Sequence, residues 1–113
     1  MQETEDFVMA SGLLLFMTDI DPTLEVEFNR WYEEEHLSER MGIPGFITAR
    51  RFQAIQGSPK YLAISDLESP DVLQSAPYRQ VVGPGKSLWT KRMESLFVNS
   101  RRNVYVGISE RHR

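Results

Sequence analysis

Residues 28–40, FNRWYEEEHLSER, carry the side chains of this chain best suited to proton chemistry. His36 is one of two histidines, and the other, His112, lies in the polar segment at the C-terminus. An unperturbed imidazole has a pKa near ~6.5, so it accepts and donates a proton close to neutrality. We therefore predict that His36 is a general acid or base. The plainer interpretation is that a partly charged imidazole near a helix C-terminus stabilises the helix dipole by roughly 0.3–1 kcal/mol.

Three neighbours of His36 could complete a small-molecule site. Tyr32 precedes it by four residues, a spacing that brings side chains into contact on a helix. Tyr32 would orient the imidazole or bind a substrate oxygen, or else be a half-buried aromatic with a solvated hydroxyl. Asn29 falls on the same edge of the helix, where it would line a cavity or stay exposed. Trp31 is expected mainly in the core.

Glu35 is unusual because a helical wheel places it on the apolar face of this segment, beside Phe28 and Trp31. An unpaired buried carboxylate is costly, so Glu35 must find a partner or stay protonated. It would form a structural pair with an arginine, or it would have a raised pKa and act as an acid or base. We favour the structural pair. The available arginines are Arg40, Arg50 and Arg51.

Other chemistries have less support in the sequence. The chain has no cysteine and no G-x-S-x-G motif, which argues against nucleophilic catalysis. The run Glu33–Glu35 cannot converge on one ion, because neighbouring helical side chains diverge by ~100°. We therefore predict no metal and no cofactor. The segment VVGPGKS lacks the spacing of a phosphate-binding loop and is interpreted as a loop, which Gly83 and Gly85 would allow to act as a lid.

Composition restricts the class of protein. The chain has 113 residues, 41% hydrophobic and 26% charged, which is typical of one globular domain. A net charge of −3 argues against nucleic acid as a partner. The longest apolar stretch, FVMASGLLLFM, is far shorter than the ~20 residues that span a bilayer, so we predict no membrane segment. The absence of cysteine fits a cytoplasmic location.

The elements that must position His36 can be read from periodicity and end signals. Asp21 as N-cap and Pro22 at the first helical position begin a helix over residues 22–40, which Gly42 ends. The remaining segments are a strand over 12–18, strands over 45–55 and 60–67 joined by QGSP, a short helix beginning SPDVLQS, a helix over 87–97 and a strand over 102–108. This order predicts an α+β, ferredoxin-like βαββαβ fold with a four-stranded antiparallel sheet and helices on one face. We expect a single domain over residues 11–109, a flexible tail over 1–10 and a polar tail over 110–113.

Such a sheet has one face without helices. Strand alternation places Phe46 with Phe52 on one side of the second strand, and the open face would carry Phe52, Tyr61 and Tyr105 or their alternates. An exposed apolar sheet face needs a cover, and a second copy of the chain would supply it. On the helix side, Tyr78 would cover one end of a cavity.

The motifs EFNRWYEEEHL, PGF with ITARRF, PKYLAISDLESPDVLQS, WTKRM and RNVY resemble the EthD-like branch of the dimeric α/β-barrel superfamily over about residues 12–107. The resemblance implies a homodimer whose two sheets close into a barrel, with a cavity between each sheet and its first helix. It also implies that the histidine of the E-H-L motif, here His36, faces that cavity. Related barrels include monooxygenases without metal or flavin, polyketide cyclases, decarboxylases and haem-handling enzymes, so the fold does not name a reaction.

The leading hypothesis is a cofactor-independent enzyme, of monooxygenase, cyclase or decarboxylase type, acting on a small hydrophobic, aromatic or oxygenated ligand. His36 is its catalytic residue, and Arg51 or Arg40 would bind an acidic group. The full substrate-binding set is Tyr32, Asn29, Trp31, Arg51, Arg40 and Tyr61. The alternative is a non-catalytic ligand-binding or accessory dimer with the same pocket. A third interpretation, a structural dimer with a filled barrel, predicts no pocket of ligand size.

Overall fold

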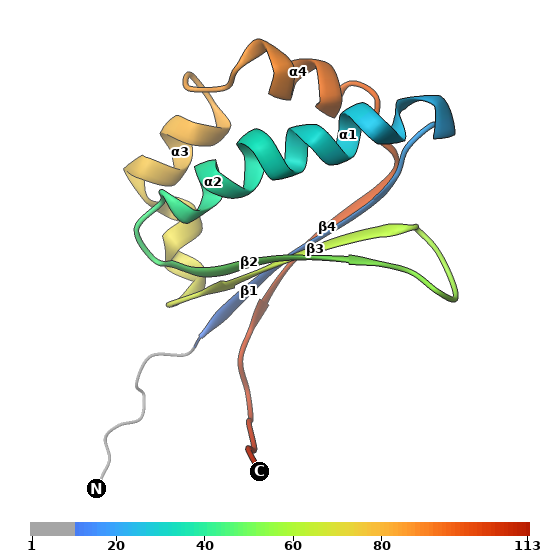
Figure 1. The fold of residues 1–113 in the computed structure, drawn as a ribbon. Coiled ribbons are helices and arrows are strands. Elements are labelled where there is room, and N and C mark those ends of the chain that lie inside the picture. The colour runs from blue at the N-terminus through green and yellow to red at the C-terminus, as the bar shows by residue number, and fades with distance from the viewer. Residues whose placement is uncertain (1–10) are drawn as a thin grey trace, which may run out of the picture.

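The computed structural model describes residues 11–113, which form a four-stranded antiparallel sheet with helices packed over one face (Figure 1). This confirms the ferredoxin-like fold class. The predicted tail over 1–10 lies outside the described residues, and the predicted domain limits stay predictions. The strands are β1 (Gly12–Asp19), β2 (Phe46–Gln53), β3 (Tyr61–Leu67) and β4 (Val98–Val106). The helical segments are η2 (Pro22–Leu24), α1 (Glu25–Trp31), η3 (Tyr32–His36), α2 (Leu37–Met41), η4 (Pro70–Gln74), α3 (Ala76–Val82) and α4 (Leu88–Glu94).

The sheet has the strand order β2-β3-β1-β4, so β1 lies inside it and pairs with both β3 and β4. Leu15 of β1 lies opposite Ile64 on one side and Asn103 on the other, near the middle of the sheet. The apolar run of β1 supplies side chains to both faces of the sheet: Leu14 and Phe16 lie on the helix side, and Leu15 lies on the opposite face.

The first helical segment is continuous from Pro22 to Met41, but it is not one regular α-helix. Asp21 caps its start, accepting a 2.8 Å hydrogen bond from the backbone N–H of Thr23. A 3₁₀ turn precedes α1, and the π-helical turn η3 separates α1 from α2. The predicted limits, 22–40, are therefore nearly right, whereas the predicted regular helix is wrong in its middle.

Three other boundaries differ from the expectation. The helix expected over 87–97 ends at Glu94, and Leu88 in its first turn is 83% exposed. Strand β4 begins at Val98, four residues before the expected start. The register with β1 shifts between Met17 and Asp19, and pairing continues past this irregularity to Val98. Asn99 lies at the irregularity, with a positive φ of 56° and a 3.1 Å hydrogen bond from its amide to Asp19. Val81 and Val82, expected in a loop, belong to α3.

A β-bulge corrects the predicted faces of β2. The register with β3 shifts between Phe46 and Thr48, so Phe46 joins the buried core instead of sharing a face with Phe52. Bulges of this kind cannot be read from alternation, because they insert one residue into the period. The prediction that Tyr61 lies on the open face is also wrong. Its side chain is 8% exposed and packs with Phe28 and Trp31 on the helix side of the sheet.

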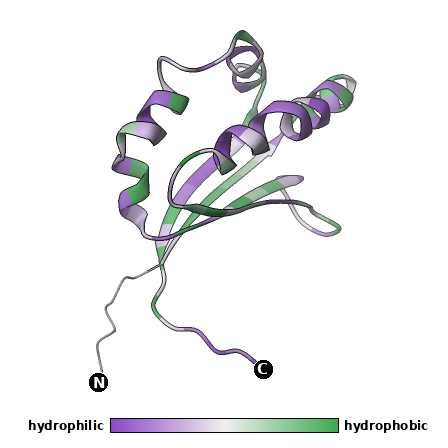
Figure 2. Ribbon diagram, turned by 60° about the vertical axis from the view of Figure 1, so that its left-hand side comes forward, coloured by the Kyte–Doolittle hydropathy of each residue, from purple (hydrophilic) through white to green (hydrophobic). Residues whose placement is uncertain are grey.

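Two apolar clusters hold the helices on the sheet. One packs Phe46, Leu67 and Tyr78, and the other packs Phe28, Trp31 and further partners beneath the first helical segment. Hydrophobic stretches run along the strands, and hydrophilic residues are frequent on the helices (Figure 2). Among residues 11–113, no helix has the length and apolar character needed to cross a membrane.

Candidate functional site

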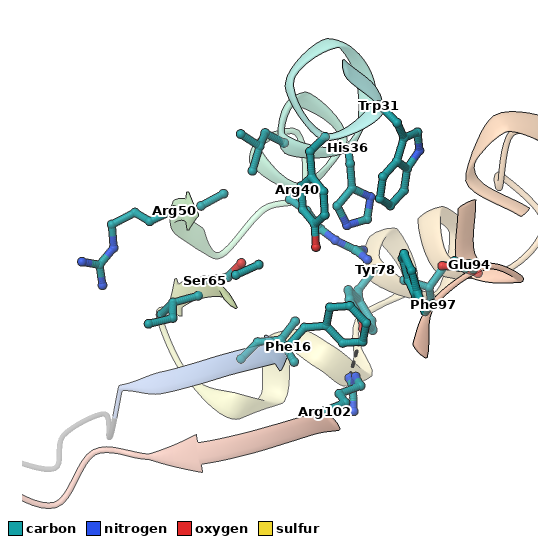
Figure 3. Close-up of a pocket in the computed structure, with 17 residues that line it drawn as sticks. Phe16, Trp31, His36, Arg40, Arg50, Ser65, Tyr78, Glu94, Phe97 and Arg102 are labelled. Atoms are coloured by element: carbon teal, nitrogen blue, oxygen red, sulfur yellow. Dashed lines mark hydrogen bonds between the residues drawn. The ribbon is translucent and has the colours of Figure 1, made fainter. Parts of the chain in front are cut away.

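A cavity of about 200 Å³ lies between the helix side of the sheet and the first helical segment. Its wall is mostly apolar and aromatic, with a few polar groups at one end (Figure 3). The lining residues used below are Phe16, Trp31, Tyr32, His36, Arg40, Arg50, Tyr78, Glu94, Phe97 and Arg102.

His36 is held in this wall by two aromatic rings. Its imidazole stacks on Trp31 with ring centres 4.4 Å apart, and it meets the edge of Tyr32 at 5.0 Å. The side chain is 12% exposed, and its Nδ1 is buried without a hydrogen-bond partner. The closest carboxylate oxygen, from Glu39, is 4.0 Å from Nδ1, which is too long for a hydrogen bond.

These surroundings change the acid–base behaviour of His36. Burial lowers the pKa of the imidazole to about 3, and the positive charges of Arg40 and Arg51 act in the same direction. Glu39 beside Nδ1 does not offset these effects. The imidazole is therefore neutral at physiological pH, with one ring nitrogen available to accept a proton.

The π-helical turn η3 places Tyr32 and His36 at its two ends. The backbone N–H of Leu37 donates to the carbonyl of Tyr32, five residues earlier, instead of four. This wider turn rotates the residues that follow it relative to a regular helix. Single π-turns inside α-helices often occur at functional sites, and here the turn contains the histidine of the cavity.

A buried hydrogen-bond chain fixes Trp31, on which His36 stacks. The indole N–H donates to the hydroxyl of Thr90 at 3.0 Å, and that hydroxyl donates to Glu35 at 2.8 Å. Ser87, the N-cap residue of α4, donates to the same carboxylate oxygen at 2.5 Å. The expected arginine partner of Glu35 is therefore wrong, because two hydroxyl groups from α4 and its cap reach the carboxylate instead.

Tyr32 is 3% exposed and lines the cavity. Burial raises the pKa of its phenol to about 12, while the nearby Arg51 and Arg40 act in the opposite direction. Its hydroxyl consequently keeps its hydrogen over the physiological range and remains a neutral hydrogen-bonding group.

Arg40 and Arg102 bring positive charge to one end of the cavity. The guanidinium of Arg40 lies over the ring of Tyr78 at 5.8 Å, and its Nη1 is buried without a hydrogen-bond partner. Arg102 donates to the hydroxyl of Tyr78 at 3.1 Å. Arg50 also lines the cavity, but its guanidinium points away and binds Asp66 at 3.1 Å (Figure 3).

Three of the residues expected to bind substrate do not line the cavity: Asn29, Arg51 and Tyr61. They bind one another and nearby carboxylates. Arg51 donates to Asn29 at 2.6 Å and to Glu33 at 2.9 Å, and the hydroxyl of Tyr61 donates to Glu25. Arg51 also lies 4.3 Å from the ring centre of Tyr32. These contacts tie the first helical segment to β2 and β3 and leave few polar atoms for a ligand.

The structure thus brings together four of the seven expected site residues, namely His36, Trp31, Tyr32 and Arg40. Sequence reasoning missed Phe16, Phe97 and Arg102. Phe16 and Arg102 are opposite each other in the β1–β4 register. That pairing, together with alternation, would have placed both on the helix side of the sheet. Within residues 11–113, no group of three or more His, Cys, Asp or Glu side chains forms a candidate metal site.

Neither a protein-family model nor a curated protein matches this chain. Solved structures do match its fold. A dimeric ferredoxin-like protein from an uncultured marine organism has a TM-score of 0.69 and 16% identity, with 93% of each chain covered. The cofactor-independent oxygenase SnoaB from Streptomyces nogalater has a TM-score of 0.62 and 16% identity, covering 89% of this chain and 94% of that one. The haem degrader MhuD from Mycobacterium tuberculosis has a TM-score of 0.63 and 10% identity, covering 89% of this chain and 99% of that one. The chain therefore has the fold of dimeric ferredoxin-like proteins, some of which are oxygenases or haem degraders.

Proposed function

We propose that this chain is an EthD-like homodimeric enzyme in which His36 acts as a general base, and then as an acid, on a small cyclic or aromatic substrate. The observation that supports it most directly is the position of the imidazole, which lines the cavity, stacks on Trp31 and makes no hydrogen bond through Nδ1 to any described residue. A neutral imidazole can accept a proton, whereas a cationic one cannot. The lowered pKa also makes His36 a weaker base than a free imidazole, so the support for the proposal is the position of the ring in the cavity wall and not its pKa.

The carboxylate of Glu39, 4.0 Å from Nδ1, suggests which ring nitrogen does the chemistry. A negative charge on that side favours the tautomer with the proton on Nδ1, because the N–H dipole then points at the carboxylate. In our proposal, Nε2 carries the lone pair that removes the substrate proton. Tyr32 stays protonated, since its pKa is raised to about 12, and offers a hydrogen bond to a substrate oxygen.

The size of the cavity restricts the substrate. A void of ~150 Å³ can hold benzene, and pockets for drug-sized ligands start near ~300 Å³. At about 200 Å³, this cavity suits one substituted ring or a small fused bicycle and not a porphyrin. The proposal therefore includes no haem, although MhuD, a protein of similar fold, degrades it.

The homodimer is the second part of the proposal. The sheet face away from the helices carries Leu13, Leu15 and Met17 of β1, with Phe52 and Tyr105 on β2 and β4. Phe52 is 46% and Tyr105 is 47% exposed, and no described residue outside the sheet covers this face (Figure 1). A second copy would bury it, and the marine ferredoxin-like protein of similar fold, which is dimeric, supports this by analogy.

The general base can be tested without knowing the substrate. The probe is 5-nitrobenzisoxazole, a small aromatic molecule that opens when a base removes its C3 proton. The C–H electron pair forms the nitrile, the N–O bond breaks, and the oxygen leaves as a coloured phenolate. We expect the protein to accelerate this opening by up to about 10²-fold, the low end of the contribution of a positioned base, because the pKa of His36 is lowered. His36→Gln should abolish the acceleration.

The matched control is His112→Gln, because His112 is 79% exposed in the C-terminal segment. That variant should accelerate the reaction like the wild type. A folded His36→Gln variant with full acceleration would contradict the proposal. Binding of the probe without acceleration by the wild type would instead favour the non-catalytic alternative.

A further inference from the structure

The polar side chains at one end of the cavity provide more hydrogen-bond donors than acceptors. The lining contains three arginines and one carboxylate, Glu94. Glu94 is paired with Lys86 at 2.6 Å, and Arg50 points away to Asp66. Arg102 has an acceptor in the hydroxyl of Tyr78. Among the described residues, the guanidinium of Arg40 has neither a hydrogen bond nor an ion pair.

The unpaired state of Arg40 is costly, because its Nη1 is buried and has no acceptor. The side chain lies over the ring of Tyr78 and borders the cavity (Figure 3). Tyr78 is 7% exposed, and its hydroxyl accepts from Arg102, so its own hydrogen is left to donate. Two buried donors, one of them cationic, thus meet at the same end of the cavity. The group that satisfies both is an anionic oxygen pair.

The other walls are apolar. Trp31, Phe16 and Phe97 contribute flat aromatic surface, and the ring of Phe16 lies 5.1 Å from that of Phe97. Aromatic walls favour a ring, and the volume of about 200 Å³ admits one ring with a short substituent.

We propose, building on the function proposed above, that the substrate is a single-ring carboxylate whose carboxylate group is bound by Arg40 and the hydroxyl of Tyr78. The ring lies among Trp31, Phe16 and Phe97, and its reacting carbon faces His36. Arg40 follows His36 by four residues across the α2 start. One helical segment therefore carries both the anchor for the anion and the base, which sets the distance between the charged group and the reacting carbon.

The test compares two probes of nearly equal size, benzoate and benzamide, by isothermal titration calorimetry and amide chemical-shift mapping at neutral pH. We expect wild-type protein to bind benzoate roughly tenfold tighter than benzamide, equivalent to about 1.4 kcal/mol. Arg40→Met should remove this preference and bind the two probes equally. The control is Arg79→Met, which changes the net charge equally from an exposed position outside the cavity and should keep the preference.

Equal binding of the two probes by the wild type would overturn the proposal, as would failure of benzoate to bind at millimolar concentration. Retained preference in a folded Arg40→Met variant would overturn it too. His36→Gln should keep the preference for benzoate, because the anchor is separate from the base. Loss of catalysis in His36→Gln and loss of the anion preference in Arg40→Met are therefore independent results, and either part can fail alone.

Discussion

The imidazole of His36 is kept neutral by burial and by the charges of Arg40 and Arg51. In the unfolded chain the same imidazole titrates near ~6.5. Between pH ~6.5 and about 3, the unfolded state therefore binds a proton that the folded state does not. Keeping His36 neutral in the folded state therefore contributes no loss of stability above pH ~6.5. As the pH falls from ~6.5 toward about 3, protonation of the unfolded state progressively destabilises the folded state.

We predict that the free energy of unfolding of the wild type decreases between pH 7 and pH 5, with a slope of at most ~1.4 kcal/mol per pH unit below ~6.5. His36→Gln removes the titrating group, so its stability should change less over this range. Urea unfolding at pH 7, 6 and 5 measures both curves.

Below pH 5, carboxylates with lowered pKa values, such as Glu25 and Glu27, lose their own contribution to stability, so the two curves are compared above that point. Burial raises the pKa of Glu39, so protonation of Glu39 makes the folded state more stable as the pH falls. Glu39 is present in both proteins, and its contribution cancels in the difference between the two curves. Parallel stability curves for the two proteins would show that His36 is solvated in the folded state.

At the scale of elements, α4 and the first helical segment are joined through the Glu35 carboxylate. Ser87 and Thr90 donate to it, and Thr90 also accepts from Trp31. The connection holds the indole on which His36 stacks. It therefore links the packing of α4 to the orientation of the base.

We predict that Thr90→Val destabilises the protein by about 1–3 kcal/mol, because it leaves the Trp31 N–H without its acceptor and removes one donor from Glu35. Valine has nearly the same shape, so little cavity cost is added. Chemical denaturation gives the free energy of unfolding, and near-ultraviolet circular dichroism reports the Trp31 environment.

Thr23→Val is the matched control, since Thr23 is exposed and its hydroxyl binds only the side chain of Asp21 among the described residues. We expect a change within about 0.5 kcal/mol. Equal stability of Thr90→Val and wild type would mean that this chain of hydrogen bonds contributes nothing to holding Trp31.

At the scale of the whole molecule, the two faces of the sheet differ: helices pack on one face, and no described segment covers the other, bare face (Figure 1). This difference is the basis of the proposed dimer. Leu15 lies near the centre of the bare face, on the strand that pairs on both sides. In the proposed dimer it is buried, whereas in a monomer it contacts water.

We predict that Leu15→Asp converts the dimer to a monomer, because the carboxylate would be buried without a partner in the interface. Sedimentation or light scattering gives the mass, and Ile55→Asp is the control, since Ile55 is fully exposed in the β2–β3 connection. A monomeric wild type, or a dimeric Leu15→Asp variant, would contradict the proposed interface.

Local signals in the chain were enough to predict the four strands and the helices that follow β1 and precede β4, but not the division of residues 70–82 into η4 and α3. The N-cap Asp21, the helix end at Gly42 and the apolar run of β1 depend on neighbours in sequence, so they are visible without the fold. The positions of His36, Trp31 and Tyr32 on one helical segment follow from the same short-range spacing.

What the sequence did not reveal depends on contacts between distant segments. The bulge after Phe46 is defined only by pairing with β3, and the partners of Glu35 come from residues 52 and 55 positions away. The same is true of Arg51 and Arg40: the sequence offered both for an anion, and the fold directed Arg51 to Asn29 and Glu33 while leaving Arg40 at the cavity. Side-chain types and local periodicity determine the elements, but hydrogen bonding and charge pairing in the folded state decide which polar groups remain for a ligand, because nearly every buried donor binds an acceptor that folding brings within reach.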